Sequence, residues 1–118
     1  MKKYTHLYTG KDGKSHFEEA EFSFETDAKG DLRTPNMKAT ALNVKISYPL
    51  PSYDWHPAPR RQFAITVEGQ VDIIASGGET RRFSPGDILL VDDLTGEGHM
   101  SKVVGKQTTA IFVPVEMK

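Results

Sequence analysis

Two histidines, His56 and His99, are the side chains best suited to chemistry. A neutral imidazole binds transition metals, and because it titrates near neutral pH it also serves as a general acid or base. One hypothesis is that both histidines converge on a metal, with Gln62 or a carboxylate such as Asp92 or Asp93 completing the ligand set. A second is that His99 transfers protons without a metal. The third is that both are hydrogen-bonded structural residues.

The proline-rich segment between residues 49 and 59 leads to further candidates for binding a small molecule. Tyr53 and Trp55, the only tryptophan, can line the mouth of a ligand site or pack against a partner chain. Arg60 can hold a carboxylate or phosphate of a ligand through two parallel hydrogen bonds. The alternative for Arg60 is a solvated charge or an ion pair with Asp92 or Asp93. Asp92 is itself a candidate ligand-binding residue.

The composition of the chain limits the classes of protein to which it can belong. The 118 residues predict one domain over residues 1–118, and a net charge of −1 gives no reason to expect nucleic-acid or anionic-membrane binding. The absence of cysteine excludes disulfides, thiolate metal sites and cysteine nucleophiles. The start of the chain has no apolar stretch typical of a signal peptide or a membrane span, so we expect a cytoplasmic protein.

The hydrophobic pattern predicts many short strands and no long helix. Residues alternate with the period of a half-buried strand, and turn-forming glycines and prolines separate the segments, which is typical of an all-β sandwich or barrel. A polar loop is expected over 27–36. The predicted strands are 19–25, 41–48, 62–67, 70–75, 81–83, 88–91, 100–104 and 108–115.

Two of these strands are apolar on one face and polar on the other. If Gln62 faces the interior, Ala64 and Thr66 face it too, because alternate residues of a strand share a face. The apolar face must then pack on another sheet or subunit, so we predict a homodimer. The apolar residues of the two strands are Phe63, Ile65 and Val67, and Leu42, Val44 and Ile46.

The region from His56 to His99 resembles the cupin superfamily. The first cupin motif is a His-x-His pair, a Glu, six residues and a Gly. With Gly69 as the anchor, Gln62 stands at the Glu position, His56 at the first His and Ala58 at the second.

The second cupin motif runs from a Gly through a Pro to a His, and a hairpin joins the two motifs. Residues 84–91, with the sequence SPGDILLV, are similar to its start, Asp92 replaces the Pro, and His99 is similar to the final His. The spacing from Gly86 to His99 is two residues longer than the pattern, and residues 96–98 can absorb the difference. The segment 71–83 is similar to the joining hairpin.

The resemblance implies a cupin-type double-stranded β-helix, or jelly-roll barrel, with the motif region at 56–104 and further strands in 1–50. A cupin metal is typically held by three His and one Glu, so Ala58 and Gln62 at two of the four places predict no bound cofactor. A weakly bound divalent transition metal would use His56, Gln62 and His99. The expected function is binding of a small polar or anionic molecule in the barrel mouth. The alternative is a cupin-type isomerase, lyase or dioxygenase that uses His56 and His99.

Overall fold

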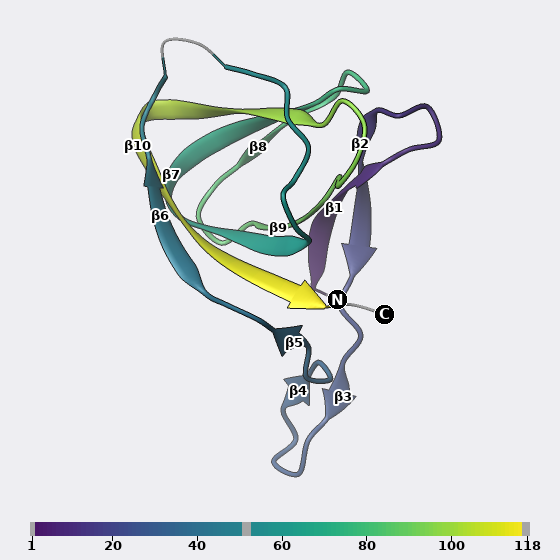
Figure 1. The fold of residues 1–118 in the computed structure, drawn as a ribbon. Helices are drawn as coiled ribbons and strands as arrows, with labels where there is room; N and C mark the ends of the chain where they lie inside the picture. The colour runs from purple at the N-terminus through teal and green to yellow at the C-terminus, as the bar shows by residue number, and fades with distance from the viewer. Residues whose placement is uncertain (1, 51–52, 117–118) are drawn as a thin grey trace.

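The computed structural model describes residues 2–50 and 53–116, which form ten strands (Figure 1). No helix long and apolar enough to cross a membrane occurs among them. The strands are β1 (Lys3–Thr9), β2 (Ser15–Glu21), β3 (Glu25–Thr26), β4 (Leu32–Arg33), β5 (Lys38–Ala39), β6 (Asn43–Ser47), β7 (Gln62–Ala75), β8 (Thr80–Phe83), β9 (Ile88–Asp92) and β10 (His99–Glu116).

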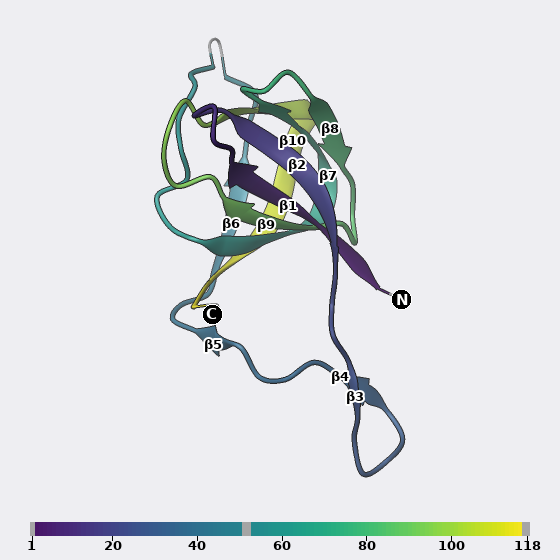
Figure 2. The same cartoon turned by 90° about the vertical axis from the view of Figure 1, so that its right-hand side faces the viewer.

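Eight of these strands form one sheet that curls on itself (Figures 1 and 2). The order β2-β1-β9-β7-β10-β5 is extended by β6, which pairs with β10, and by β8, which pairs with β7. β1 pairs with β9 in parallel, and the other pairs are antiparallel. The predicted all-β fold of the jelly-roll type is confirmed by this arrangement.

Two predicted strand pairs are each one long strand in the structure. The segments 62–67 and 70–75 join into β7, and the segments 100–104 and 108–115 join into β10. Gly69 is therefore a bend inside β7 rather than a turn: its φ is +71°, and a Cβ there would collide with the backbone oxygen of Gln107. The facing register shift between Val104 and Thr109 lets both strands curve together.

The N-terminal half corrects two further predictions. The strand expected over 19–25 starts earlier, at Ser15, and ends at Glu21. The polar loop expected over 27–36 lies mostly in a small hairpin of β3 and β4, which projects from the barrel as an arm (Figure 2). Two hydrogen bonds to the Asp27 side chain, from the backbone N–H groups of Lys29 and Asp31, hold the turn of this hairpin.

The hairpin predicted over 71–83 is present, with Gly77 and Gly78 at its tip. The Arg82 guanidinium donates two hydrogen bonds to Asp72, of 2.8 and 3.1 Å, across β7 and β8. These bonds hold the pKa of the Asp72 carboxyl below its usual 3.8. The pair therefore stabilises the hairpin above that pH, and the contribution is lost as the pH falls through the lower pKa of the folded state.

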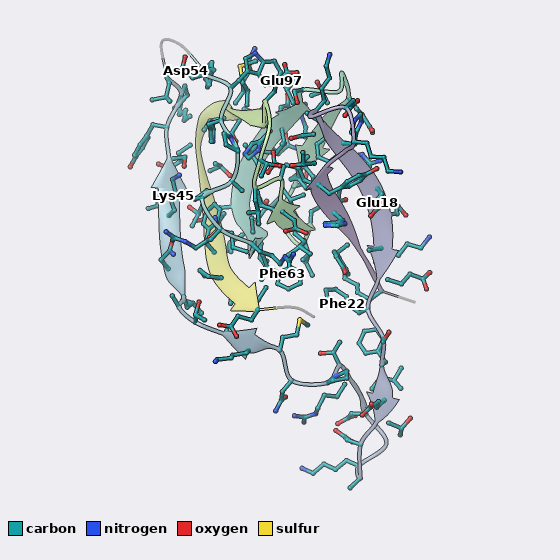
Figure 3. All side chains as sticks on the ribbon, turned by 45° about the vertical axis from the view of Figure 1, so that its right-hand side comes forward. Glu18, Phe22, Lys45, Asp54, Phe63 and Glu97 are labelled. Carbon is teal, nitrogen blue, oxygen red and sulfur yellow. The ribbon has the colours of Figure 1, made fainter. Side chains whose placement is uncertain are left out.

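Alternate residues of β7 face opposite sides of the sheet, as predicted. Gln62, Ala64 and Thr66 line a cavity inside the barrel, whereas Phe63 and Ile65 line an apolar groove of about 470 Å³ on the outer side. Figure 3 shows Phe63 on the same side of the barrel as Phe22, and their ring centroids lie 6.1 Å apart.

β6 turns its apolar face outward. Leu42, Val44 and Ile46 are exposed by 50–67%, while Lys45 and Ser47 line the interior cavity. The homodimer inferred from these apolar residues stays a prediction.

Candidate functional site

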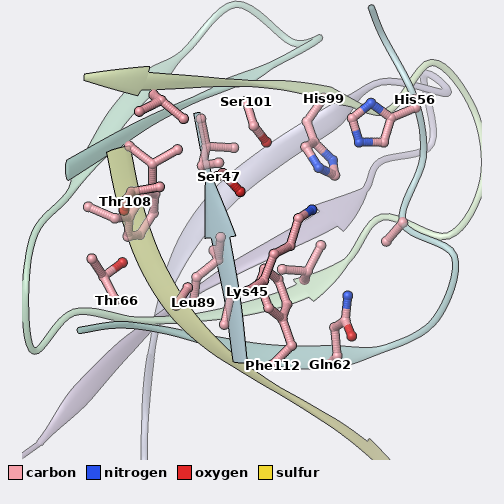
Figure 4. Close-up of a pocket in the computed structure, with 18 of the residues that line it drawn as sticks. Lys45, Ser47, His56, Gln62, Thr66, Leu89, His99, Ser101, Thr108 and Phe112 are labelled. Carbon is pink, nitrogen blue, oxygen red and sulfur yellow. The ribbon is translucent and has the colours of Figure 1, made fainter. Parts of the chain in front are cut away.

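The barrel encloses a cavity of about 550 Å³, which lies within the range of roughly 300–1,000 Å³ typical of small-molecule sites (Figure 4). Strands β6 to β10 and the segment 53–59 form its wall. Its polar lining residues include Lys45, Ser47, Tyr53, Asp54, His56, Gln62, Thr66, His99, Ser101 and Thr108. Its apolar lining residues include Val71, Ile73, Phe83, Leu89, Val91 and Phe112.

The structure brings His56 and His99 together at this cavity. Their backbones form an isolated antiparallel bridge with N···O distances of 3.0 and 2.9 Å, and their ring centroids are 4.7 Å apart. A Cβ at Gly98 would collide with the His56 backbone, so a glycine at this position permits the bridge. His99 is 6% exposed, whereas His56 is exposed at the rim.

A buried carboxylate fixes the orientation of the His99 ring. His99 Nδ1 lies 2.6 Å from Asp93 Oδ2, and Asp93 is completely buried. Because a carboxylate oxygen accepts hydrogen bonds, Nδ1 carries the ring proton, which leaves the lone pair of the neutral imidazole on Nε2. Ser15 donates a second hydrogen bond of 2.7 Å to the same Asp93 oxygen.

The His56 ring is oriented in a similar way by the backbone. Its Nδ1 lies 3.2 Å from the carbonyl oxygen of Asp54, which only accepts, so Nδ1 carries the proton here too. Among the described residues, neither Nε2 atom has a hydrogen-bond partner. Each imidazole therefore has one nitrogen fixed by the protein and one left for a ligand.

Asp93 also keeps one oxygen without a partner. Its Oδ1 is buried and receives no hydrogen bond from the residues that the structure describes. An unpaired buried carboxylate oxygen costs stability, so the chain retains an unfavourable group beside the cavity. A buried polar atom without a partner calls for an explanation, and a role for the Asp93–His99 pair beyond packing is one such explanation.

The other residues predicted for the site divide into two groups. Tyr53 and Gln62 line the cavity with the histidines. Trp55, Arg60 and Asp92 are not among its lining residues, and Trp55 is 48% exposed.

Asp92 has partners outside the cavity. Its carboxylate accepts hydrogen bonds from His6 Nε2 at 2.9 Å and from Arg61 Nε at 2.7 Å. An ion pair with Asp92 was one alternative for Arg60, but in the structure the neighbouring Arg61 forms this ion pair. Asp92 is the last residue of β9 and Asp93 follows it directly; side chains alternate along a strand, so Asp93 continues the side of Val91, which lines the cavity, and reaches His99.

The residues at the site that were not predicted include Lys45, Ser47 and Ser15. Lys45 and Ser47 share the polar face of the alternating segment 41–48, and this alternation could have indicated that both side chains lie on the same side of the strand. Ser15 had no signal, because it is 78 residues from Asp93 in the sequence and only the fold brings them together.

The side chains at the cavity do not make a complete cupin metal site. The described residues contain no group of three or more His, Cys, Asp or Glu side chains that could hold a metal. Two imidazoles and the neutral amide of Gln62 are fewer strong ligands than zinc or iron sites use. This donor set does not fit the cupin metal.

Comparison with known proteins adds little to this geometry. No protein family and no curated protein sequence matches the chain. Among solved structures, the chain is similar to a Salmonella typhimurium LT2 protein provisionally described as ethanolamine utilization protein Q. The TM-score is 0.49 and the identity 10%, over 98% of this chain and 96% of the other. At this level of likeness the fold assignment depends on the strand order of the chain itself.

Proposed function

We propose that this protein is a cupin-like cytoplasmic protein that binds a small polar or anionic molecule in its barrel cavity. The observation that carries the proposal is the pair of imidazoles at the cavity wall, each with Nδ1 held and Nε2 free. Binding groups that are already oriented lose little entropy when a ligand arrives. The rest of the cavity provides apolar surface for the body of a ligand, as small-molecule sites commonly do.

Trp55 offers a direct test of binding, because it is the only tryptophan and is adjacent to His56. Titration with small carboxylates and sugars is expected to change its fluorescence. For any compound that binds, His99→Ala should weaken affinity by about tenfold, the value of one charge-assisted hydrogen bond. On the hypothesis that Arg60, which is exposed and follows the lining residue Pro59, binds an anionic group of the ligand, Arg60→Ala should weaken affinity similarly.

His16→Ala is the matched control, because His16 pairs with Asp12 at 3.0 Å and is not among the residues that line the cavity. Equal affinity in wild type and His99→Ala would contradict the proposal. Unchanged affinity in Arg60→Ala would remove only Arg60 from the site.

A second candidate function, proton transfer by His99, is favoured by the Asp93 hydrogen bond. In this reaction Nε2 takes a proton from a carbon next to a carbonyl of the bound molecule, and the electron pair of that C–H bond moves onto the carbonyl oxygen. Asp93 would stabilise the resulting imidazolium, as a carboxylate does for a histidine base in other enzymes. Return of the proton to another carbon would give an isomerase.

Hydrogen–deuterium exchange tests this second function without knowledge of the product. In D₂O, wild-type protein should catalyse exchange at the carbon next to the carbonyl of a ligand found by fluorescence. His99→Gln should slow the exchange by about 100-fold, the lower end of general-base contributions, and His16→Gln should not change it. An unchanged rate in His99→Gln would exclude His99 as the base.

A further inference from the structure

We infer that the ligand of the barrel cavity is a small organic acid with an apolar body, and that Lys45 binds its carboxylate. This inference rests on the proposed function, because it concerns the same cavity. It adds the chemical class of the ligand and the residue that recognises its charge.

Lys45 is an exposed lysine that lines the cavity and has no carboxylate partner among the residues that the structure describes. It lies on β6, and in Figure 4 its side chain extends toward the side of the cavity that holds His99 and Gln62. Its Nζ lies 5.6 Å from the centroid of the Phe112 ring, and no carboxylate lies within ion-pair distance of it in the described part of the chain. The basic residues that do form ion pairs with Asp or Glu include Lys3, Arg33, Lys38, Arg61, Arg81 and Arg82.

The orientation of β6 supports a polar occupant. β6 is exposed along most of its length, with Val44 exposed by 61% and Ile46 by 50%, and Lys45 and Ser47 are the side chains of this strand that line the cavity. The side of β6 at the cavity therefore offers a cation and a hydroxyl, which suit a polar or charged ligand.

The remaining lining limits the type of acid. Asp54, at the exposed rim, is the other permanently charged side chain among the residues that line the cavity, so a single cation faces the ligand and a monoanion matches it best. Val71, Ile73, Phe83 and Leu89 form apolar wall from β7, β8 and β9. An organic acid with an aliphatic or aromatic body matches both features, because its carboxylate can pair with Lys45 and its body can contact the apolar wall.

Benzoate and benzamide form a nearly isosteric probe pair that separates charge from shape. We expect wild-type protein, followed by ¹H–¹⁵N NMR titration, to bind benzoate about tenfold more tightly than benzamide. Lys45→Gln should remove this difference by weakening benzoate alone. Lys102→Gln is the matched control, since Lys102 also lies over a ring, 5.5 Å from the Tyr53 centroid, but does not line the cavity.

The outcomes separate this inference from the proposed function. Equal affinity for the two probes in wild type, or a preference for benzoate that survives in a folded Lys45→Gln, would overturn the role of Lys45 and leave binding in the cavity intact. If neither probe shifts the signals of His56, His99 or Gln62 at millimolar concentration, while a ligand found by Trp55 fluorescence does, the class of acid named here is wrong. If no compound shifts those signals, both proposals fail.

Discussion

The double variant Ala58→His with Gln62→Glu should bind a divalent transition metal at least about 1,000-fold more tightly than wild type. Both positions line the cavity beside His56 and His99, and Ala58 is 5% exposed. The substitutions would raise the strong ligands from two to four and add one negative charge. The hydrogen bonds on the two Nδ1 atoms already orient the histidines in the way that metal-binding imidazoles are usually held.

Competition with a chromophoric chelator measures this gain, and elemental analysis gives the metal content of the purified protein. A triple variant that adds His99→Ala should lose most of the affinity. Wild-type protein that purifies with one tightly bound metal per chain would contradict the interpretation of the motif as incomplete, and Asp92, Asp93 or Glu97 would have to supply ligands. A folded double variant that binds no metal would show that the alignment to the first cupin motif, which places Ala58 and Gln62 at ligand positions, is wrong.

Asp93→Ala should lower the free energy of unfolding by about 2–6 kcal/mol, because two buried hydrogen-bond donors lose their acceptor at a cost of about 1–3 kcal/mol each. The substitution leaves the Ser15 hydroxyl and His99 Nδ1 without their acceptor in a part of the protein that solvent does not reach. It also leaves a cavity where the carboxylate was. The backbone hydrogen bond from Ala58 to the Asp93 carbonyl, 2.9 Å, is unaffected by the change.

Urea denaturation followed by Trp55 fluorescence measures the loss. Asp72→Ala is the matched control, because Asp72 is also a hydrogen-bonded carboxylate but its partner Arg82 is exposed, and only a small loss is expected there. Asp93→Asn, which keeps the shape and one acceptor, should fall between the two. A loss in Asp93→Ala no larger than that in Asp72→Ala would mean that the buried network does not stabilise the fold.

The faces of the strands were predictable, but their lengths were not. Alternation placed Gln62, Ala64 and Thr66 on one side of β7 correctly, because a side-chain period of two follows from strand geometry alone. The same pattern could not show that β7 continues through Gly69. Glycine is common both in turns and at bends inside long strands, and only the partner strand β10 distinguishes them.

For the candidate site, the sequence predicted the histidines but not the residues that give them their chemistry. His56 and His99 were found because they stand at motif positions. Ser15 and Lys45 were not assigned roles, and Asp93 was considered only as a metal ligand, since their importance depends on contacts between segments that are distant in the sequence. Asp92 and Asp93 are chemically identical, and only the pleat of the strand determines which of them reaches His99.

The position of β10 in the sheet has a consequence for how the protein is made. β10 pairs with β5, β6 and β7, yet the ribosome synthesises it after all three. Until residues 99–116 leave the exit tunnel, the edges of β6 and β7 that β10 will cover remain open in the nascent chain. Strand edges of this kind recruit other extended chains, so the interval before release is when chaperone protection matters most for this molecule.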